Sequence, residues 1–134
     1  MSQENVEVIR QGWDAWLRGD LPALFRNCDP EIVWDTSHFR EWPESDYHGI
    51  EGLQRFLEEW LDVWDEYEMS LEDVRAAPDG RVVSLFCHRG KGRGSGVPLE
   101  LAMAQIATLR NGKITRLENY SDRDEALEAA GLRE

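Results

Sequence analysis

The hydrophobic periodicity of this chain changes once, after Trp64, and that change limits the folds open to it. From Ile50 to Trp64 apolar residues recur every three or four positions with acidic residues between them, which indicates an amphipathic helix. After Trp64 the apolar residues alternate, and short turns separate the alternating runs, which predicts hairpin-linked strands. These strands are expected at residues 67–71, 81–88, 98–109 and 113–121. This order is typical of an α+β fold with helices packed on one face of an antiparallel sheet.

The N-terminal third contains shorter elements of both kinds. Residues 3–18 place apolar side chains on one helical face, and Gly19 ends this helix. Asp20 is expected to cap a short second helix, after which a turn leads into a short strand that ends at Trp34. Residues 36–48 have no regular period and include a proline, so we predict a loop there.

The C-terminus carries the signals of one more helix. Asp122 and Glu125 can form a capping box at the start of a helix over residues 123–130, and Gly131 can end it. No repeat or linker interrupts the sequence. The 134 residues are enough for one hydrophobic core, so we expect a single domain over residues 1–134.

The strongly acidic composition excludes several classes of partner. The net charge is −12 and the pI about 4.6, which repels nucleic-acid backbones and anionic lipids. No stretch resembles a membrane span or a signal peptide, so we expect a cytoplasmic protein without nucleic-acid or membrane partners. In that setting Cys28 and Cys87 are expected to be reduced, buried thiols.

The central strands are apolar on both faces, although the helices can cover only one of them. On the second face the alternation places Leu85, Cys87, Ala104 and Ile106. An exposed apolar sheet face usually marks an interface, so the pattern predicts a homodimer through these residues. The alternative is that the sheet twist and the C-terminal helix cover this face within one chain.

The first face carries isolated polar residues in otherwise apolar rows. His88, Gln105 and Asn119 each stand alone among apolar neighbours. Each could be a satisfied core hydrogen-bonding group. Together with Asp35, which directly follows the strand ending at Trp34, they favour a pocket between sheet and helices with a few convergent polar groups.

Three segments of the chain resemble a known family. They are "GDLPALFRNCDPEIVWD", "YHGIEGLQRFLEEW" and "LRNGKITRLENYSDRDEALEAAGL". Together with the element order, they resemble the SnoaL-like polyketide cyclase group of the nuclear transport factor 2-like superfamily, which also contains ketosteroid isomerases and limonene-epoxide hydrolases. The resemblance implies a curved sheet wrapped by helices into a cone with an internal pocket, commonly as a dimer. It leaves activity open, because the superfamily contains both enzymes and binding domains.

The catalytic residues of these relatives are only partly present. The resemblance places the proton-shuttling base of the isomerases at Asp35 and their oxyanion-hole acid at Gln105, whose amide could still donate a hydrogen bond. Their oxyanion tyrosine falls near Gly12 and is missing. The arginine, aspartate and third acid of the epoxide hydrolases fall at Phe86, His88 and Asn119, so that triad is not preserved.

The combined prediction is an apolar pocket with a small polar set. Asp35, assisted by His88, would act as acid and base on a polyketide-, steroid- or terpenoid-like substrate, as an isomerase, cyclase or hydrolase. Gln105 or Asn119 would bind the developing oxyanion. The substrate-binding wall is expected to comprise Trp16, Phe25, Trp34, Trp60, Trp64, Phe86, Met103 and Leu117.

Alternative interpretations remain for the protein and for Asp35. The same cone could serve as a non-catalytic ligand-binding domain, or as a dimeric regulatory or carrier domain. Asp35 could simply start a turn by accepting hydrogen bonds from the backbone of Thr36 and Ser37. No cofactor or metal is expected, since His38 and His48 fit a solvated loop better than a metal site.

Overall fold

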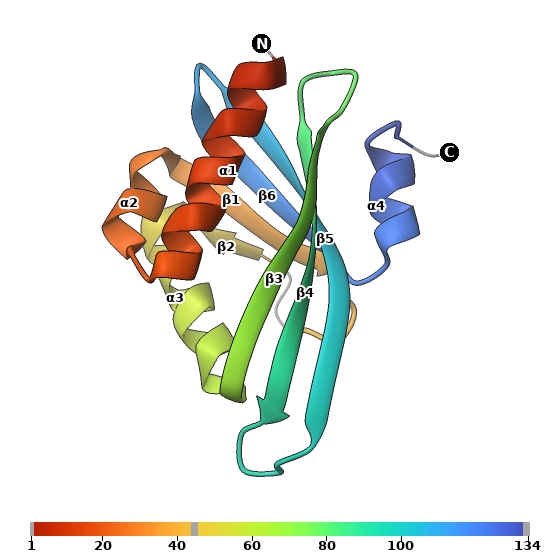
Figure 1. Ribbon diagram of the computed structural model, residues 1–134. Coiled ribbons are helices and arrows are strands. Elements are labelled where there is room, and N and C mark those ends of the chain that lie inside the picture. The colour runs from red at the N-terminus through yellow and green to blue at the C-terminus, as the bar shows by residue number, and fades with distance from the viewer. Residues whose placement is uncertain (1, 44–45, 133–134) are drawn as a thin grey trace.

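The computed structural model describes residues 2–43 and 46–132. Four helices and six strands follow one another along the chain (Figure 1). They are α1 (Ser2–Arg18), α2 (Leu21–Arg26), β1 (Cys28–His38), β2 (Asp46–His48), α3 (Gly49–Asp62), β3 (Trp64–Ala76), β4 (Val82–Gly92), β5 (Pro98–Arg110), β6 (Lys113–Tyr120) and α4 (Arg123–Ala129). This order confirms the α+β class.

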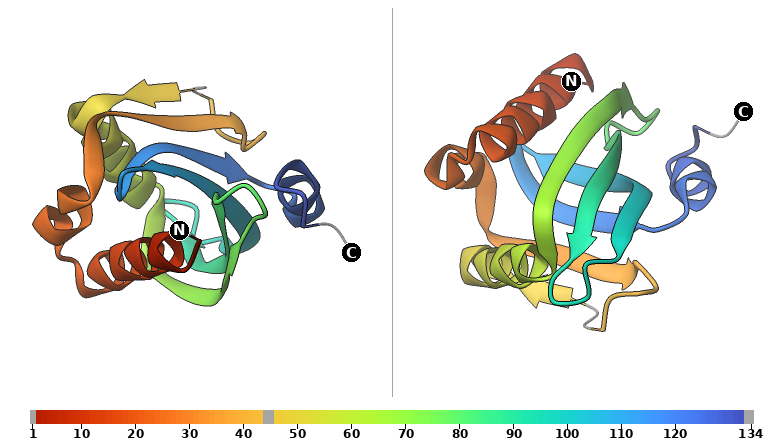
Figure 2. Two further views of the ribbon diagram at one scale, coloured as in Figure 1. Left: turned by 90° about the horizontal axis from the view of Figure 1, so that it is seen from above. Right: turned by 60° about the horizontal axis from the view of Figure 1, so that its bottom comes forward.

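The six strands form one curved sheet in the order β2-β1-β6-β5-β4-β3. Helices α1, α2 and α3 lie on its inner side and α4 lies on the other (Figure 2). All pairings are antiparallel except that of β1 with β6, which is parallel and was not expected from the sequence. A parallel pair needs a long crossover, and here the whole chain between β1 and β6 provides it.

Two boundaries differ from the sequence prediction. Helix α3 ends at Asp62, and Trp64 already belongs to β3, although its ring still contacts Trp60 at 5.4 Å between centroids. The helical periodicity from Ile50 to Trp64 therefore included Trp64, which packs against α3 but belongs to β3.

The prediction of a loop over residues 36–48 is wrong at both ends. β1 continues to His38, and the short β2 pairs with Val33, Trp34 and Asp35 at the sheet edge. Strand pairing here depends on the neighbouring strand, which a search for local periodicity does not detect.

The apolar residues form one cluster on each side of the sheet. The outer cluster contains Leu85, Ala104 and Ile106, which are buried by Ala126 and Ala130 of α4. Cys87 is also buried. Coverage by the C-terminal helix was the alternative to the dimer, so these residues have little surface left to offer a partner. The homodimer stays a prediction.

Helix α4 is held in place at its beginning. Asp122 Oδ1 accepts hydrogen bonds from the backbone N–H of Asp124 at 2.9 Å and of Glu125 at 3.2 Å. The Glu125 carboxylate, expected to complete a capping box, instead forms an ion pair with Arg40 after β1. Among the described helices, none is long and apolar enough to cross a membrane.

Candidate functional site

A cavity of about 80 Å³ lies between the inner face of the sheet and helices α1, α2 and α3. Its wall is mostly aromatic and aliphatic. The lining residues are Ile9, Gly12, Trp13, Trp16, Leu24, Cys28, Trp34, Phe39, Leu53, Phe56, Leu57, Trp60, Phe86, His88, Met103, Gln105, Ile114, Leu117 and Asn119. The cavity is thus enclosed by residues from across the chain, which the curvature of the sheet brings together.

Most of the expected wall residues border this cavity, but two do not. Phe25, on the short helix α2, is half-buried and packs against the inner core without reaching the cavity. Trp64 lies behind the lining, where its ring contacts Trp60 at 5.4 Å and Tyr67 at 5.2 Å between centroids. It therefore supports the wall rather than forming it.

One polar group of the wall is the pair formed by His88 and Tyr67. The Tyr67 hydroxyl lies 2.7 Å from His88 Nδ1. Burial lowers the pKa of His88 to about 4, so its imidazole is neutral near pH 7. Burial also raises the pKa of Tyr67 to about 12, although the nearby indole N–H groups of Trp60 and Trp16 act in the opposite direction.

These contacts favour one tautomer of the imidazole. An indole N–H can only donate, so Trp60 and Trp16 direct donors at the phenol oxygen, and the Tyr67 proton points to His88 Nδ1. With Nδ1 as acceptor, a neutral imidazole carries its proton on Nε2. His88 therefore offers the cavity a hydrogen-bond donor.

A second polar group lies further along the sheet. Gln105 Nε2 donates to Asn119 Oδ1 at 3.2 Å, and both side chains are buried. Ser84 is paired in register with Gln105 and accepts a hydrogen bond from Trp13 Nε1 at 2.8 Å. Ser84 and His88 are four positions apart on β4, which places the two polar groups about 13 Å apart along the strand.

Two buried indole nitrogens have no hydrogen-bond acceptor among the described residues. They are Nε1 of Trp34, in the cavity wall, and Nε1 of Trp64, behind it. A buried donor without a partner costs about 1–3 kcal/mol. The folded protein therefore loses some stability by burying these two indole groups in and behind the aromatic wall.

Asp35 does not face this cavity, which corrects the expectation that it shares the space with His88. Side chains alternate along β1, so the inward position of Trp34 turns Asp35 to the outer face. There Asp35 Oδ1 accepts the backbone N–H of Ser37 at 2.8 Å, and Oδ2 pairs with Arg116 Nη2 at 2.5 Å. The alternative that Asp35 starts a turn thus accounts for the hydrogen bond from Ser37 but not for the ion pair with Arg116.

The outer surroundings of Asp35 keep it ionised. Burial alone would raise the pKa of the Asp35 carboxyl, but the hydrogen bonds from Ser37 and the Arg116 guanidinium outweigh it and hold that pKa below its usual range. An acid of this kind is a poor general base near neutral pH.

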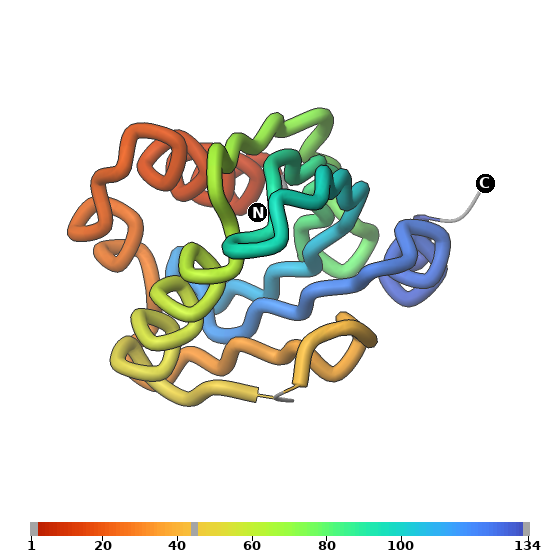
Figure 3. The backbone as a smooth tube through the Cα atoms, turned by 90° about the horizontal axis from the view of Figure 1, so that it is seen from below, coloured from red at the N-terminus to blue at the C-terminus, as the bar shows by residue number. Residues whose placement is uncertain are grey.

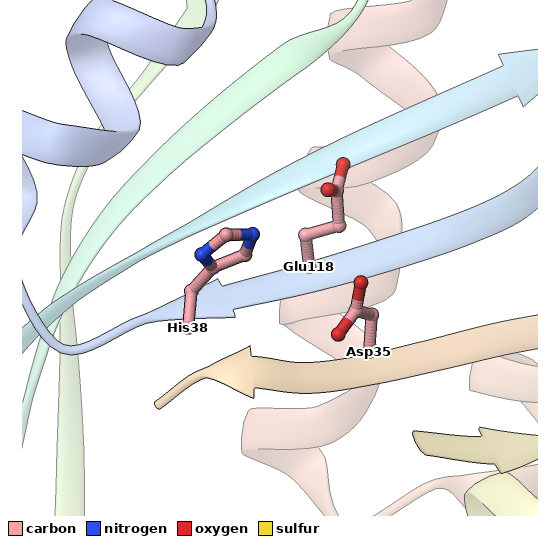
Figure 4. A group of neighbouring side chains, drawn as sticks. All are labelled: Asp35, His38 and Glu118. Carbon is pink, nitrogen blue, oxygen red and sulfur yellow. The ribbon is translucent and has the colours of Figure 1, made fainter. Parts of the chain in front are cut away.

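Asp35, His38 and Glu118 form a cluster on the outer face (Figure 4). Each offers one potential metal ligand, and these atoms lie within 4.8 Å of one another. However, Arg116 already pairs with Asp35 and lies 3.9 Å from Glu118 Oε2, and His38 stacks on Tyr120 at 4.3 Å. The cluster is therefore better described as an ion-pair network that joins β1 to β6.

The sequence interpretation missed the partner of His88. Tyr67 was recognised as one residue of an alternating strand, but its hydrogen bond crosses from β3 to β4 in a register that alternation alone does not give. Strict alternation along the last strand would turn Ile114 to the outer face, whereas it lines the cavity. The pairing of β5 with β6 shifts between Thr108 and Leu109, and this irregularity reverses the alternation.

Comparisons with known proteins agree with this architecture. The sequence profile of the SnoaL-like domain matches residues 9–117. A nuclear transport factor 2-like protein from Burkholderia thailandensis has a TM-score of 0.79 at 22% identity, over 93% of this chain and 95% of that one. One from Burkholderia xenovorans has a TM-score of 0.74 at 26% identity, over 97% of each chain.

Another similar structure is that of TerC co-crystallised with polyporic acid. It has a TM-score of 0.75 at 20% identity, over 95% of this chain and 97% of that one, which shows a shared fold. A search of curated proteins found no match. The profile match covers most of the described sequence, and the chain belongs to the SnoaL-like domain family.

Proposed function

We propose that this protein binds a small, uncharged and largely apolar molecule in the inner cavity. The observation that supports the proposal is the composition of the wall: aromatic and aliphatic side chains surround a few polar groups, and the lining contains no Asp, Glu, Lys or Arg. His88, the one titratable imidazole among them, is neutral near pH 7. Apolar pockets with a few placed polar groups are typical of small-molecule sites.

The absence of a charged lining residue argues against an ionic ligand. A carboxylate or ammonium group that enters such a wall loses its hydration without gaining a counterion, which is strongly unfavourable. The net charge of −12 further opposes the approach of anions. The ligand is therefore expected to carry hydroxyl, ether or carbonyl groups, which Asn119 and His88 can bind.

A second candidate is proton transfer to such a ligand, and the Tyr67–His88 pair favours it. His88 Nε2–H can donate to a carbonyl oxygen while Tyr67 supports Nδ1 at 2.7 Å. Asp35, the carboxylate expected to act as the general base, lies on the outer face. We therefore propose ligand binding as the first candidate function and catalysis as the second. An isomerase, cyclase or hydrolase activity would need a base other than Asp35.

The similarity to TerC provides limited support. That protein was co-crystallised with polyporic acid, so the shared fold is compatible with a small organic ligand. At 20% identity the similarity extends to the fold alone, so the ligand of this chain is inferred from the residues of its own cavity wall.

The proposal is tested with a matched pair of probes in isothermal titration calorimetry. 1-Butanol is uncharged at pH 7 and butyrate is an anion with the same number of carbon atoms, so the pair differs mainly in charge. Both are narrower than benzene, as a cavity of about 80 Å³ requires. We expect 1-butanol to bind and butyrate to bind at least tenfold more weakly.

Two variants of α1 show whether binding occurs in the cavity. Gly12→Leu adds a side chain inside the wall and should abolish binding, whereas Gln11→Leu adds the same side chain at the neighbouring exposed position and should not. Equal binding of both probes, or equal behaviour of the two variants, would contradict the proposal.

A further inference from the structure

An open groove lies on the surface next to the inner cavity. It is bordered by the C-terminal ends of α1 and α3 and by β3, and has a volume of about 590 Å³. Figure 3 shows these three elements gathered around one side of the molecule. The groove residues are Trp16, Leu17, Arg18, Gly19, Leu21, Leu61, Tyr67, Glu68 and Met69.

A single layer of side chains separates the groove from the cavity. Trp16 borders both spaces. Tyr67 borders the groove, and its hydroxyl is hydrogen-bonded to His88, which borders the cavity. We define Trp16, Tyr67 and His88 as the partition. Tyr67 and His88 touch through a ring contact at 5.6 Å between centroids and one hydrogen bond at 2.7 Å, so rotation of a few side chains would join the two spaces.

The volumes show why such a connection matters. A cavity of about 150 Å³ holds benzene, and drug-sized molecules occupy pockets of roughly 300–1,000 Å³. At about 80 Å³ the inner cavity is too small for either. Any larger ligand must therefore extend beyond it.

The surface of the groove suits an apolar extension. Leu17 and Leu61 are 51% and 43% exposed, and both lie in the groove, although large apolar side chains are normally buried. The charge of Arg18 is already paired with Asp14 and, at 3.3 Å, with Asp20. The guanidinium is thus less available to attract an anionic ligand.

We propose that the groove is the outer half of the binding site. An elongated, uncharged, lipophilic molecule places its polar end near Gln105 and Asn119, passes the opened partition, and leaves its apolar end against Leu17 and Leu61. Tyr67 is the residue that controls passage and selects ligands by length. This inference rests on the proposed function, since it extends the same cavity.

The inference is tested with the n-alkanols from 1-butanol to 1-dodecanol, measured by calorimetry, because the longer members can span the roughly 13 Å between the two polar groups. Each additional buried methylene contributes about 0.8 kcal/mol, which is roughly a fourfold gain in affinity. If the groove accepts the chain, the gain per methylene continues through the longer members of the series. If the cavity alone binds, affinity stops rising at a short chain length.

A pair of variants identifies the groove as the place where the added methylenes lie. Leu61→Asp introduces a charge into the groove and should remove the gain of the longer alkanols while leaving 1-butanol unchanged. Val63→Asp introduces the same charge two residues away, at a position 38% exposed and outside the groove lining, and should have little effect. Equal effects of the two variants would overturn the inference.

The partition is tested by the exchange rate of 1-dodecanol, followed by NMR line shape. Tyr67→Phe keeps the ring but removes the hydrogen bond to His88, so dissociation should become roughly two- to tenfold faster. Tyr120→Phe, a buried tyrosine on the outer face, is the control and should leave the rate unchanged. An unchanged rate in Tyr67→Phe would refute a gating role.

The possible failures are distinguishable. If 1-butanol binds but longer chains gain nothing, the groove proposal is wrong and the cavity proposal stands. If no alkanol binds, both are wrong.

Discussion

The burial of His88 predicts a loss of stability on mild acidification. Its pKa is lowered from 6.5 to about 4 because the imidazole is desolvated in the cavity wall. Between these two values the unfolded chain binds a proton that the folded chain does not. The free energy of unfolding must therefore fall as the pH decreases through this window.

The size of the effect follows from the two pKa values. A shift from 6.5 to about 4 corresponds to roughly 3 kcal/mol once the pH is below both values. At pH 5 the unfolded imidazole is almost fully protonated and the folded one hardly at all, which gives about 2 kcal/mol. Asp35 does not contribute here, because its lowered pKa confines its titration to more acidic solutions.

Urea unfolding at pH 7, 6 and 5 measures this term. His88→Gln removes the imidazole but keeps an amide that can accept from Tyr67. Its stability relative to the wild type should therefore rise by about 2 kcal/mol between pH 7 and pH 5. A curve for His88→Gln that runs parallel to the wild type would refute the assigned burial of this imidazole.

Three further predictions follow from the core and the outer face. Gly12→Ala should stabilise the protein by about 0.5–1 kcal/mol in thermal or urea unfolding, because Gly12 lies inside α1 and an added Cβ meets only Leu24 Cδ1 at 3.7 Å; a loss of stability would show that this space is not free. Phe86→Ala should cost about 3–5 kcal/mol in urea unfolding, because the ring is 2% exposed and packs on Trp13; a loss below 1 kcal/mol would contradict its place in the wall. Asp35→Asn should cost about 1 kcal/mol at pH 7 through the lost Arg116 pair, and the difference from the wild type should shrink as the pH falls below the usual pKa of an aspartate; an unchanged difference at pH 3 would refute an ionised Asp35.

The parts of this molecule that repeat locally are predictable from sequence. Apolar residues at helical spacing located α1 and α3, and alternation placed Phe86, Met103 and Gln105 on one face of the central strands. The cavity wall could be anticipated because it consists of these same periodic positions.

Features that depend on contacts between segments far apart in sequence were harder to predict. The sequence interpretation ended the first strand at Trp34 and placed Asp35 with the pocket residues, whereas β1 continues to His38 and its alternation turns Asp35 outward to Arg116. Tyr67 reaches His88 through cross-strand register, and α4 reaches Ala104 and Ile106 through the chain reversal after β6. Such contacts join segments far apart in sequence, and no local pattern encodes them.

The central claim is that an uncharged ligand occupies the cavity enclosed by Trp34, Phe86 and Met103. A crystal structure of the protein soaked with 1-butanol tests it most directly. The claim predicts electron density for the butanol chain among these three side chains in the wild type and in Gln11→Leu, and none there in Gly12→Leu. Density for 1-butanol only at the molecular surface, or a cavity that contains ordered water in the soaked wild-type crystal, would contradict it.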